Sequence, residues 1–186
     1  MPGLLIIVAV VFLLPIIYVV LTYNTLVALR NHIRDAWSNI DTELKRRYDL
    51  IPNLVATVKG YAAHEKEAFE RVTELRAQCM AGRGAAGEQA ADENLLAAAL
   101  QKLLAVVENY PELKADKHFL ELQRELVETE DRIQAARRFF NGNVRDYQNK
   151  CQTFPSSVIA AVFGFESRDY FQVHPSVREV PDVDFG

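Results

Sequence analysis

Residues Leu4–Leu21 read LLIIVAVVFLLPIIYVVL, an unbroken apolar run in a chain of 186 residues. With Thr22 and Tyr23 the run reaches the roughly 20 residues that an α-helix needs to cross about 30 Å of hydrocarbon. Tyr23 falls where a membrane–water interface favours an aromatic ring with a polar tip. Pro15 removes one backbone hydrogen bond, which a membrane helix tolerates better than a helix in water. The sequence therefore predicts a membrane anchor over residues 1–23, with anchor residues Leu4, Leu5, Ile6, Ile7, Val8, Phe12, Pro15, Ile16, Tyr18 and Tyr23.

A cleaved signal peptide is the alternative explanation of this apolar run. The preceding residues, MPG, contain no Lys or Arg, and the following TYNTLVALRN lacks the small-x-small pattern of a cleavage site, which favours an uncleaved anchor. Arg30 and Arg34 follow the run closely, the stretch 45–47 adds three more basic residues, and none precedes it. Because basic residues tend to stay on the inner side, we expect a single-pass protein of the bacterial inner membrane with a cytoplasmic domain.

Beyond the anchor, apolar residues recur at alternating three- and four-residue steps, as in helices that pack one face against other helices. The first seam comprises Trp37, Ile40, Leu44, Tyr48, Ile51, Val55, Val58 and Ala62, followed by Phe69, Val72 and Cys79. The second comprises Leu96, Ala99, Leu103, Val106 and Tyr110. The third comprises Phe119, Leu122, Leu126, Thr129, Ile133, Ala136, Phe140, Val144, Tyr147, Cys151 and Phe154.

The interruptions between these seams predict the connections of the fold. Glycines at 82, 84 and 87 and the proline at 111 mark turns, whereas Pro52 leaves the phase of its seam unchanged and predicts a kinked but continuous helix. Short connections make neighbouring helices antiparallel, and no stretch has the period-two alternation of a strand. We therefore predict an all-α protein: an antiparallel up-and-down bundle of long, kinked helices over residues 24–171, followed by an extended tail over 172–186.

Composition and motifs argue against catalysis and against nucleic acid as a partner. The net charge is −4, with no basic stripe for a polyanion. His64-Glu65 begins a zinc-binding HExxH pattern, but Ala68 stands where the second histidine is needed. The carboxylates of Glu125, Glu128, Glu130 and Asp131 spread around a helix, and pairs such as Glu43 with Arg47 are expected on solvated outer faces. We expect no enzymatic activity, no cofactor and no metal site.

Two apolar regions are candidate contacts for a further copy or a partner. The membrane-proximal helix has no obvious antiparallel cover, so we expect part of its apolar row to stay free and to support a homo-oligomer: Leu26, Leu29, Ile33, Trp37 and Ile40. The C-terminal aromatic segment supplies Phe163, Phe165, Tyr170 and Phe171 around a short helix from about 156 to 163. It forms either an interaction patch or a cover on the core. Insertion into the membrane is the less favoured reading, since that short helix has no Lys or Arg.

Several long motifs resemble those of the LemA family. They are AWSNID at 36–41, KRRYDLIPNLV at 45–55, and three short motifs near the C-terminus: FP at 154–155, FGF at 163–165 and YF at 170–171. The resemblance extends from Tyr23 to Phe171, and the main departure is the alanine- and glycine-rich stretch at 80–90. The chain is thus similar to LemA proteins over nearly its whole length.

The resemblance implies a single-span membrane protein with an antiparallel helical bundle and no established enzymatic activity. It also implies a scaffold or partner role, with an envelope protein as partner. Membrane lipid and further copies of the chain are the partners that the anchor and the apolar row predict. The alternative is a partner or regulatory subunit of a membrane-associated enzyme such as a zinc metalloprotease. It supplies no catalytic residue to carry over to this sequence.

Overall fold

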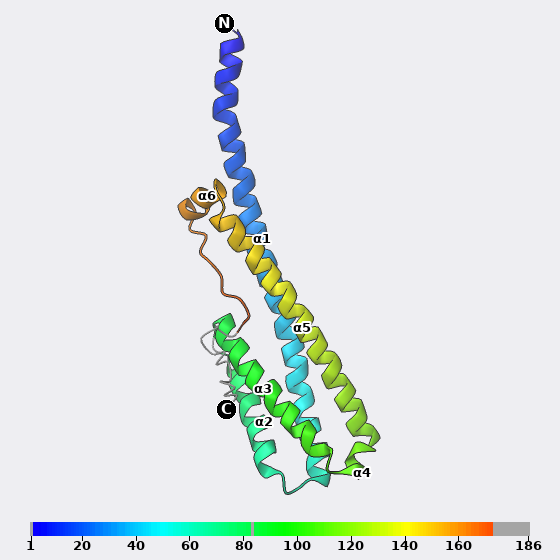
Figure 1. Cartoon of the computed structure of the whole chain (residues 1–186). Helices are drawn as coiled ribbons and strands as arrows, with labels where there is room; N and C mark the ends of the chain where they lie inside the picture. Colours follow the sequence, from blue (N-terminus) through cyan, green and yellow to red (C-terminus); the bar gives the residue numbers. More distant parts are fainter. Residues whose placement is uncertain (1, 83, 173–186) are drawn as a thin grey trace, which may run out of the picture. The chain divides into compact units, whose positions relative to one another are not determined.

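The fold is known from a computed structural model, which describes residues 2–82 and 84–172. Within these ranges the chain forms six helices and no strand (Figure 1). The predicted all-α class and the long apolar N-terminal helix are confirmed. The predicted limits of anchor, bundle and tail remain predictions, and residues 173–186 of that tail lie outside the described part.

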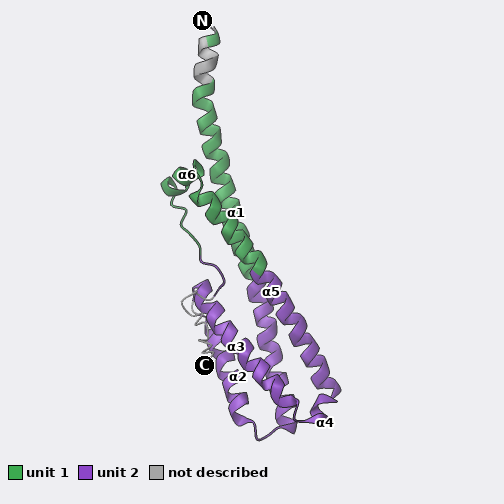
Figure 2. Ribbon diagram, viewed as in Figure 1, with its two compact units in different colours: residues 1–38, 138–168 green, residues 39–137, 169–186 purple. Residues whose placement is uncertain are grey.

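The chain divides into two compact units, coloured separately in Figure 2. Unit 1 consists of residues 1–38 and 138–168, and unit 2 of residues 39–137 and 169–186. Two helices, α1 (Pro2–Tyr61) and α5 (Lys117–Gln152), each contribute residues to both units.

Helix α1 is 60 residues long and passes through Pro15 and Pro52 without a break. The prediction that Pro52 leaves the helix continuous is therefore confirmed. Phe12 and Ile16 are 69% and 60% exposed, and α1 is long and apolar enough to cross a membrane. The side chains of the predicted anchor residues 4–8 (Leu4, Leu5, Ile6, Ile7 and Val8) fall outside the described residues.

In unit 1 the membrane-proximal part of α1 packs beside α5, and α6 (Ser156–Val162) lies close to α1 (Figure 1). The rings of Trp37 and Phe140 meet edge to face, with centroids 5.5 Å apart. Buried apolar side chains from the three helices make up the core: Leu26, Ile33, Ala36, Phe140, Val144, Tyr147, Ile159 and Ala160.

The expectation of a free apolar row on the membrane-proximal helix is wrong for most of its members. Leu26 and Ile40 are fully buried and Ile33 is 8% exposed, because the chain covers this face itself. Leu29 and Trp37 are half-buried. Part of this cover is α5, whose 36 residues extend far enough to bring Phe140 against Trp37 of α1.

Unit 2 contains the second part of α1, the first part of α5, and the helices α2 (Lys66–Ala81), α3 (Ala86–Val107) and α4 (Pro111–Lys114). Most of the predicted seam positions are buried. Two positions shift by one residue: Leu54 is buried where the sequence indicated Val55, and Val107 where it indicated Val106.

The connections within unit 2 follow the glycines and prolines with one exception. Gly82 and Gly84 have φ values of 61° and 80°, a conformation that glycine adopts without steric cost, and they turn the chain from α2 into α3. Pro111 stands at the first position of α4, where a backbone N–H would have no hydrogen-bond partner within the helix, so its absence costs nothing. The break after Tyr61 is the exception, because the sequence seam continued across it.

Candidate functional site

The membrane-proximal end of unit 1 brings the C-terminal aromatic segment against the end of the predicted anchor. The Tyr23 ring meets the rings of Phe163 and Phe165 edge to face, with centroids 5.0 and 5.6 Å apart. The Arg30 guanidinium lies 5.6 Å from the centroid of the Phe165 ring, a geometry in which a cation is attracted to the face of an aromatic ring. The segment is thus fixed to α1 by aromatic contacts.

Two hydrogen bonds from α5 hold residues 164–168, which follow α6 and which we call the strap. The Tyr147 hydroxyl donates to the Glu166 carbonyl oxygen at 2.8 Å, and Gln148 Nε2 donates to the Arg168 carbonyl oxygen at 2.7 Å. Burial, the largest cause, together with the neighbouring Cys151 side chain raises the pKa of Tyr147 to about 12. Tyr147 therefore stays protonated and acts as a donor at physiological pH.

The predicted aromatic contact residues fall into different environments. Phe163 is 51% exposed, whereas Phe165 and Tyr170 are half-buried and Phe171 is 2% exposed. The segment is therefore an exposed patch at one end and a cover on the core at the other. Phe171 belongs to unit 2, where the Arg137 guanidinium lies 4.6 Å from its ring centroid.

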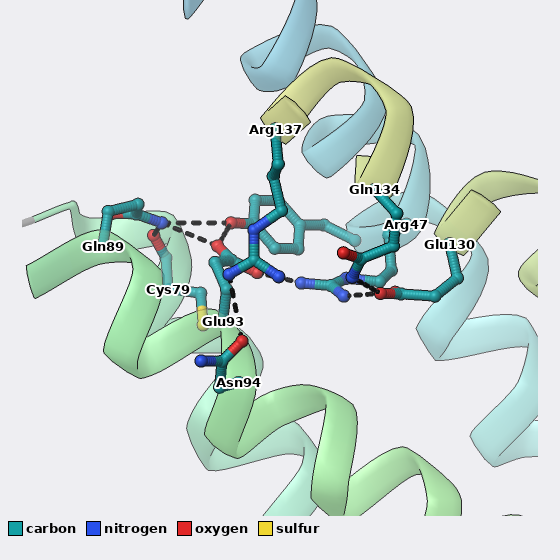
Figure 3. Close-up of polar contacts among 9 residues, drawn as sticks. Arg47, Cys79, Gln89, Glu93, Asn94, Glu130, Gln134 and Arg137 are labelled. Atoms are coloured by element: carbon teal, nitrogen blue, oxygen red, sulfur yellow. Dashed lines mark hydrogen bonds and ion pairs between the residues drawn. The ribbon is translucent and has the colours of Figure 1, made fainter. Parts of the chain in front are cut away.

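A buried polar network occupies the interior of unit 2 (Figure 3). Arg47 from α1 is 1% exposed and Glu93 from α3 is 2% exposed, and the two form an ion pair through Arg47 Nη2 and Glu93 Oε2. Arg47 Nη1 also donates to Glu130 Oε2 on α5 at 2.8 Å. One guanidinium therefore joins three helices.

The second oxygen of Glu93 collects donors from α1 and α3. The Tyr48 hydroxyl donates to Glu93 Oε1, and Gln89 Nε2 donates to the same oxygen at 2.6 Å. Burial, with the Glu93 carboxylate as a further cause, raises the pKa of Tyr48, and the same two effects raise the pKa of the Cys79 thiol to about 12. Both groups are therefore neutral at pH 7, and Cys79 is a poor nucleophile.

The outer part of the network joins α5 to the same cluster. Gln134 Nε2 donates to Glu130 Oε1 at 2.8 Å, and Arg137 Nη2 donates to Asn94 Oδ1 at 3.0 Å. Burial lowers the pKa of Arg137, which is nevertheless a strong base and remains charged. Figure 3 shows both side chains reaching toward the Arg47 and Glu93 pair.

This arrangement suits structural pairing better than acid–base chemistry. A general acid or base must reach a substrate, and both oxygens of Glu93 are already held by Arg47, Tyr48 and Gln89. Described cavities of about 300 and 350 Å³ lie elsewhere in unit 2 and are lined by other residues, which include Phe119, Gln123, Glu67 and Leu95. The network thus links helices through a fully buried Glu93 carboxylate, while the Glu130 side chain is 36% exposed.

Sequence reasoning missed this network because it assigned the charges to outer faces. Arg47 was expected to pair with Glu43 on the surface, and this is wrong: the side chain is buried and its partners come from α3 and α5. Its position did carry a signal, since Arg47 lies three residues after Leu44 and four before Ile51, in phase with the buried seam.

The other residues that the sequence singled out are dispersed. His64 is exposed in the turn between α1 and α2, and Glu125 and Glu128 are exposed on α5. Among the described residues, no group of three or more His, Cys, Asp or Glu is placed so that it could hold a metal ion. Cys79 and Cys151 are both free thiols.

Comparison with known proteins adds a family and three relatives. The profile of the LemA family matches residues 36–185. The magnetosome protein MamQ 2 of Paramagnetospirillum magneticum is 28% identical over 179 residues, which cover 83% of this chain and 66% of the relative. MamQ of Magnetospirillum gryphiswaldense is 27% identical with the same coverage, and Protein LemA of Metamycoplasma hominis is 27% identical over 164 residues, 87% of this chain and 73% of the relative. The chain thus spans slightly under two thirds of the length of the MamQ relatives.

Proposed function

The chain belongs to the LemA family, and we propose that it is a single-pass, membrane-anchored helical protein that acts through interactions rather than catalysis. One observation carries the proposal: the exposed apolar segment and the first helix of the bundle are the same uninterrupted helix, α1. A bundle mounted in this way is held at the membrane without a flexible linker. The absence of glycine between the anchor and residue 59 supports this reading.

Deleting the apolar segment tests the anchoring step. A chain that lacks Leu4–Ile17 keeps Tyr23, and with it the ring contacts to Phe163 and Phe165. We expect this variant in the soluble fraction with its far-UV circular dichroism still helical, and the full chain in the membrane fraction after alkaline extraction. Full-length protein in the soluble fraction would contradict the proposal.

Charged substitutions within the segment provide a sharper comparison. A Lys at the centre of a membrane helix costs about 2.5 to 3.5 kcal/mol of insertion free energy, so Val11→Lys combined with Leu14→Lys should release much of the protein from membranes. Leu120→Lys is the matched control, because Leu120 is 47% exposed in unit 2. Equal membrane retention of both variants would argue against a spanning helix.

Self-assembly is the interaction that we propose first. Leu29 and Trp37 keep part of their apolar surface exposed, and anchored chains meet at a higher effective concentration than free ones. A cysteine at Leu29, in a chain whose two native cysteines are replaced by alanine, should form a disulfide-linked dimer in native membranes under mild oxidation. An exposed-site control is Glu88→Cys. Equal dimer yields at both positions would indicate random collision and contradict a specific contact.

A cytoplasmic bundle at the bacterial inner membrane is the second part of this proposal. Arg30 and Arg34 support it, because basic residues that follow a span bias the orientation of that span during insertion. This bias does not depend on the contacts that the same residues make in the folded protein. In the same cysteine-replaced chain, Glu88→Cys should react with a membrane-impermeant maleimide only after spheroplasts are lysed. Labelling of intact spheroplasts would place the bundle on the outer side.

A further inference from the structure

Helix α6 and the residue two places before it carry an apolar face that the chain leaves exposed. Phe154, Val158 and Val162 follow one another at four-residue intervals and are 79%, 55% and 74% exposed. Phe163, the next residue, is 51% exposed. We call these four side chains the α6 surface. The other side of α6 is buried in unit 1 through Ser156, Ile159 and Ala160.

The α6 surface adjoins the predicted membrane span. Phe163 touches Tyr23, which ends the span, at a ring-centroid distance of 5.0 Å. Helix α1 exposes large apolar side chains immediately before this point, including Leu21 at 61% and Val20 at 53%. Figure 1 shows α6 beside α1, and this part of α1 and α6 both belong to unit 1.

A groove connects the other end of the α6 surface to the predicted span. Phe154 lines this groove of about 350 Å³ together with Tyr18 and Leu29 of α1 and with Asn149 and Lys150 of α5. Tyr18 lies about 7.5 Å deeper along α1 than Tyr23, at a rise of 1.5 Å per residue. Leu29 lies about 9 Å from Tyr23 in the opposite direction, so the groove crosses the level of Tyr23, where the predicted span ends. Amphipathic helices at a membrane interface bury their apolar face to a depth of about 5 to 10 Å.

Basic side chains near this surface come from the helices beside α6. The sequence alone disfavoured membrane insertion because α6 has no Lys or Arg of its own. In the structure Lys150 of α5 lines the groove with Phe154, and Arg30 of α1 lies over the Phe165 ring. Long basic side chains at such a boundary can extend toward lipid phosphates. One carboxylate, Asp146, also lines the groove.

We propose that the α6 surface is inserted in the membrane–water interface of the leaflet on the bundle side, with lipid acyl chains as its occupant. This inference rests on the proposed membrane anchoring of α1. Lipid is the expected neighbour because the surface adjoins Tyr23, at the end of the predicted span, where a chain that spans the bilayer meets the membrane–water interface. Four apolar side chains without a charged residue among them suit acyl chains. The bundle is then held to the membrane at two places.

Depth-dependent fluorescence quenching tests the proposal on the full chain. Cys79 and Cys151 are replaced by alanine, and single cysteines introduced as Val162→Cys, Phe12→Cys or Phe139→Cys carry an environment-sensitive fluorophore. Phe139 is 59% exposed. Its neighbour Phe140 contacts Trp37, which lies about 21 Å from Tyr23 along α1, on the side away from the predicted span. Phe139 is therefore the matched control in unit 1. The protein is reconstituted in phosphatidylcholine and phosphatidylglycerol vesicles with nitroxide-labelled lipids or aqueous iodide.

The three positions separate this inference from the anchoring on which it rests. We expect Val162 to be quenched several-fold more by a nitroxide near the headgroup than by iodide, Phe12 to be quenched by a deep nitroxide, and Phe139 by iodide alone. Iodide quenching at Val162 with Phe12 still in lipid would overturn the inference and leave the anchor intact. Iodide quenching at Phe12 would overturn the anchor.

Protection of Val162 from both quenchers would mean that a second copy or another protein covers the α6 surface, and this would also overturn the proposal. A photoreactive amino acid at Val162 in the otherwise unchanged sequence provides an independent measurement if the cysteine-free chain folds poorly. Crosslinks to lipid support the proposal, and crosslinks to protein refute it.

Discussion

Removing the Glu93 carboxylate should destabilise the bundle more than any surface substitution. In Glu93→Leu, Arg47 keeps its contact with Glu130 but loses its fully buried partner. The Tyr48 hydroxyl and Gln89 amide lose their shared acceptor as well. Breaking a buried ion pair by removing one member costs about 3 to 5 kcal/mol, because an uncompensated charge stays behind.

Thermal unfolding of the full chain in a mild detergent, followed by far-UV circular dichroism, measures this loss. For proteins of this size each kcal/mol shifts the midpoint by about 2 to 4 °C, so Glu93→Leu should lower Tm by about 6 to 20 °C. Arg46→Met is the matched control: Arg46 precedes Arg47, its side chain is 50% exposed, and its contact with Glu43 is 3.8 Å long. Such an exposed pair contributes less than about 1 kcal/mol.

The double variant distinguishes a coupled pair from two independent losses. Arg47→Met with Glu93→Leu removes both charges and replaces them with apolar side chains, so its cost should be smaller than that of either single change. A Glu93→Leu midpoint within the range of Arg46→Met would refute the reasoning. So would a double variant whose loss equals the sum of the single losses.

Three further variants examine the thiol, the aromatic pair and the strap. The unfolded Cys79 thiol loses its proton above its ordinary pKa of 9.0 while the folded one keeps it to about 12. Stability should therefore fall as pH rises through that window, by at most about 1.4 kcal/mol per pH unit, and Cys79→Ala should flatten the slope. Trp37→Ala removes a half-buried ring from Phe140 and should cost about 2 kcal/mol, below the 3 to 5 kcal/mol of a fully buried one. Tyr147→Phe deletes the hydrogen bond to Glu166 and should cost about 1 kcal/mol.

Denaturant unfolding of each variant measures these changes in the free energy of unfolding. For Cys79→Ala and the unchanged chain the measurement is repeated at several pH values. An alkaline slope unchanged in Cys79→Ala would show that this thiol does not couple to folding. A loss below about 0.5 kcal/mol for Trp37→Ala would mean that its ring contact with Phe140 contributes little, since surface substitutions fall in that range. Wild-type stability of Tyr147→Phe would show that the hydrogen bond from Tyr147 to Glu166 contributes nothing measurable to the free energy of unfolding.

The helical class and most core positions follow from the sequence because helix periodicity is a local property. Ile40, Leu44, Ile51 and Val58 are buried as their spacing indicates, and Pro52 leaves the helix intact. The single-residue shifts at Leu54 and Val107 arise because 3.6 residues per turn lets two adjacent positions compete for one place in a seam.

The pairing of distant residues could not be obtained in the same way. Arg47 and Glu93 lie 46 positions apart, and their contact depends on how α1 and α3 pack. A charge on an apolar seam signals a buried pair but does not identify its partner. Likewise the row from Leu26 to Ile40 looked free because its cover, α5, comes a hundred residues later in the chain.

The C-terminal aromatic segment shows a related limit. Its residues were recognised in the sequence, but their division between exposure and burial was left open. Phe163 and Phe171 are only eight residues apart, yet one is half-exposed near the anchor and the other is buried in unit 2. Tertiary packing decides between them, and composition does not distinguish the two rings.

The most direct test of a membrane-anchored interaction protein is the mass of the complex that the full chain forms in its own membrane. The protein is extracted with its surrounding lipid into nanodiscs and weighed by native mass spectrometry. Our proposal predicts a species of two or more 21.1-kDa chains. One chain with a defined second protein would replace self-assembly by a partner complex. A single 21.1-kDa chain with no protein partner, in nanodiscs and in gentle detergents alike, would contradict the proposal.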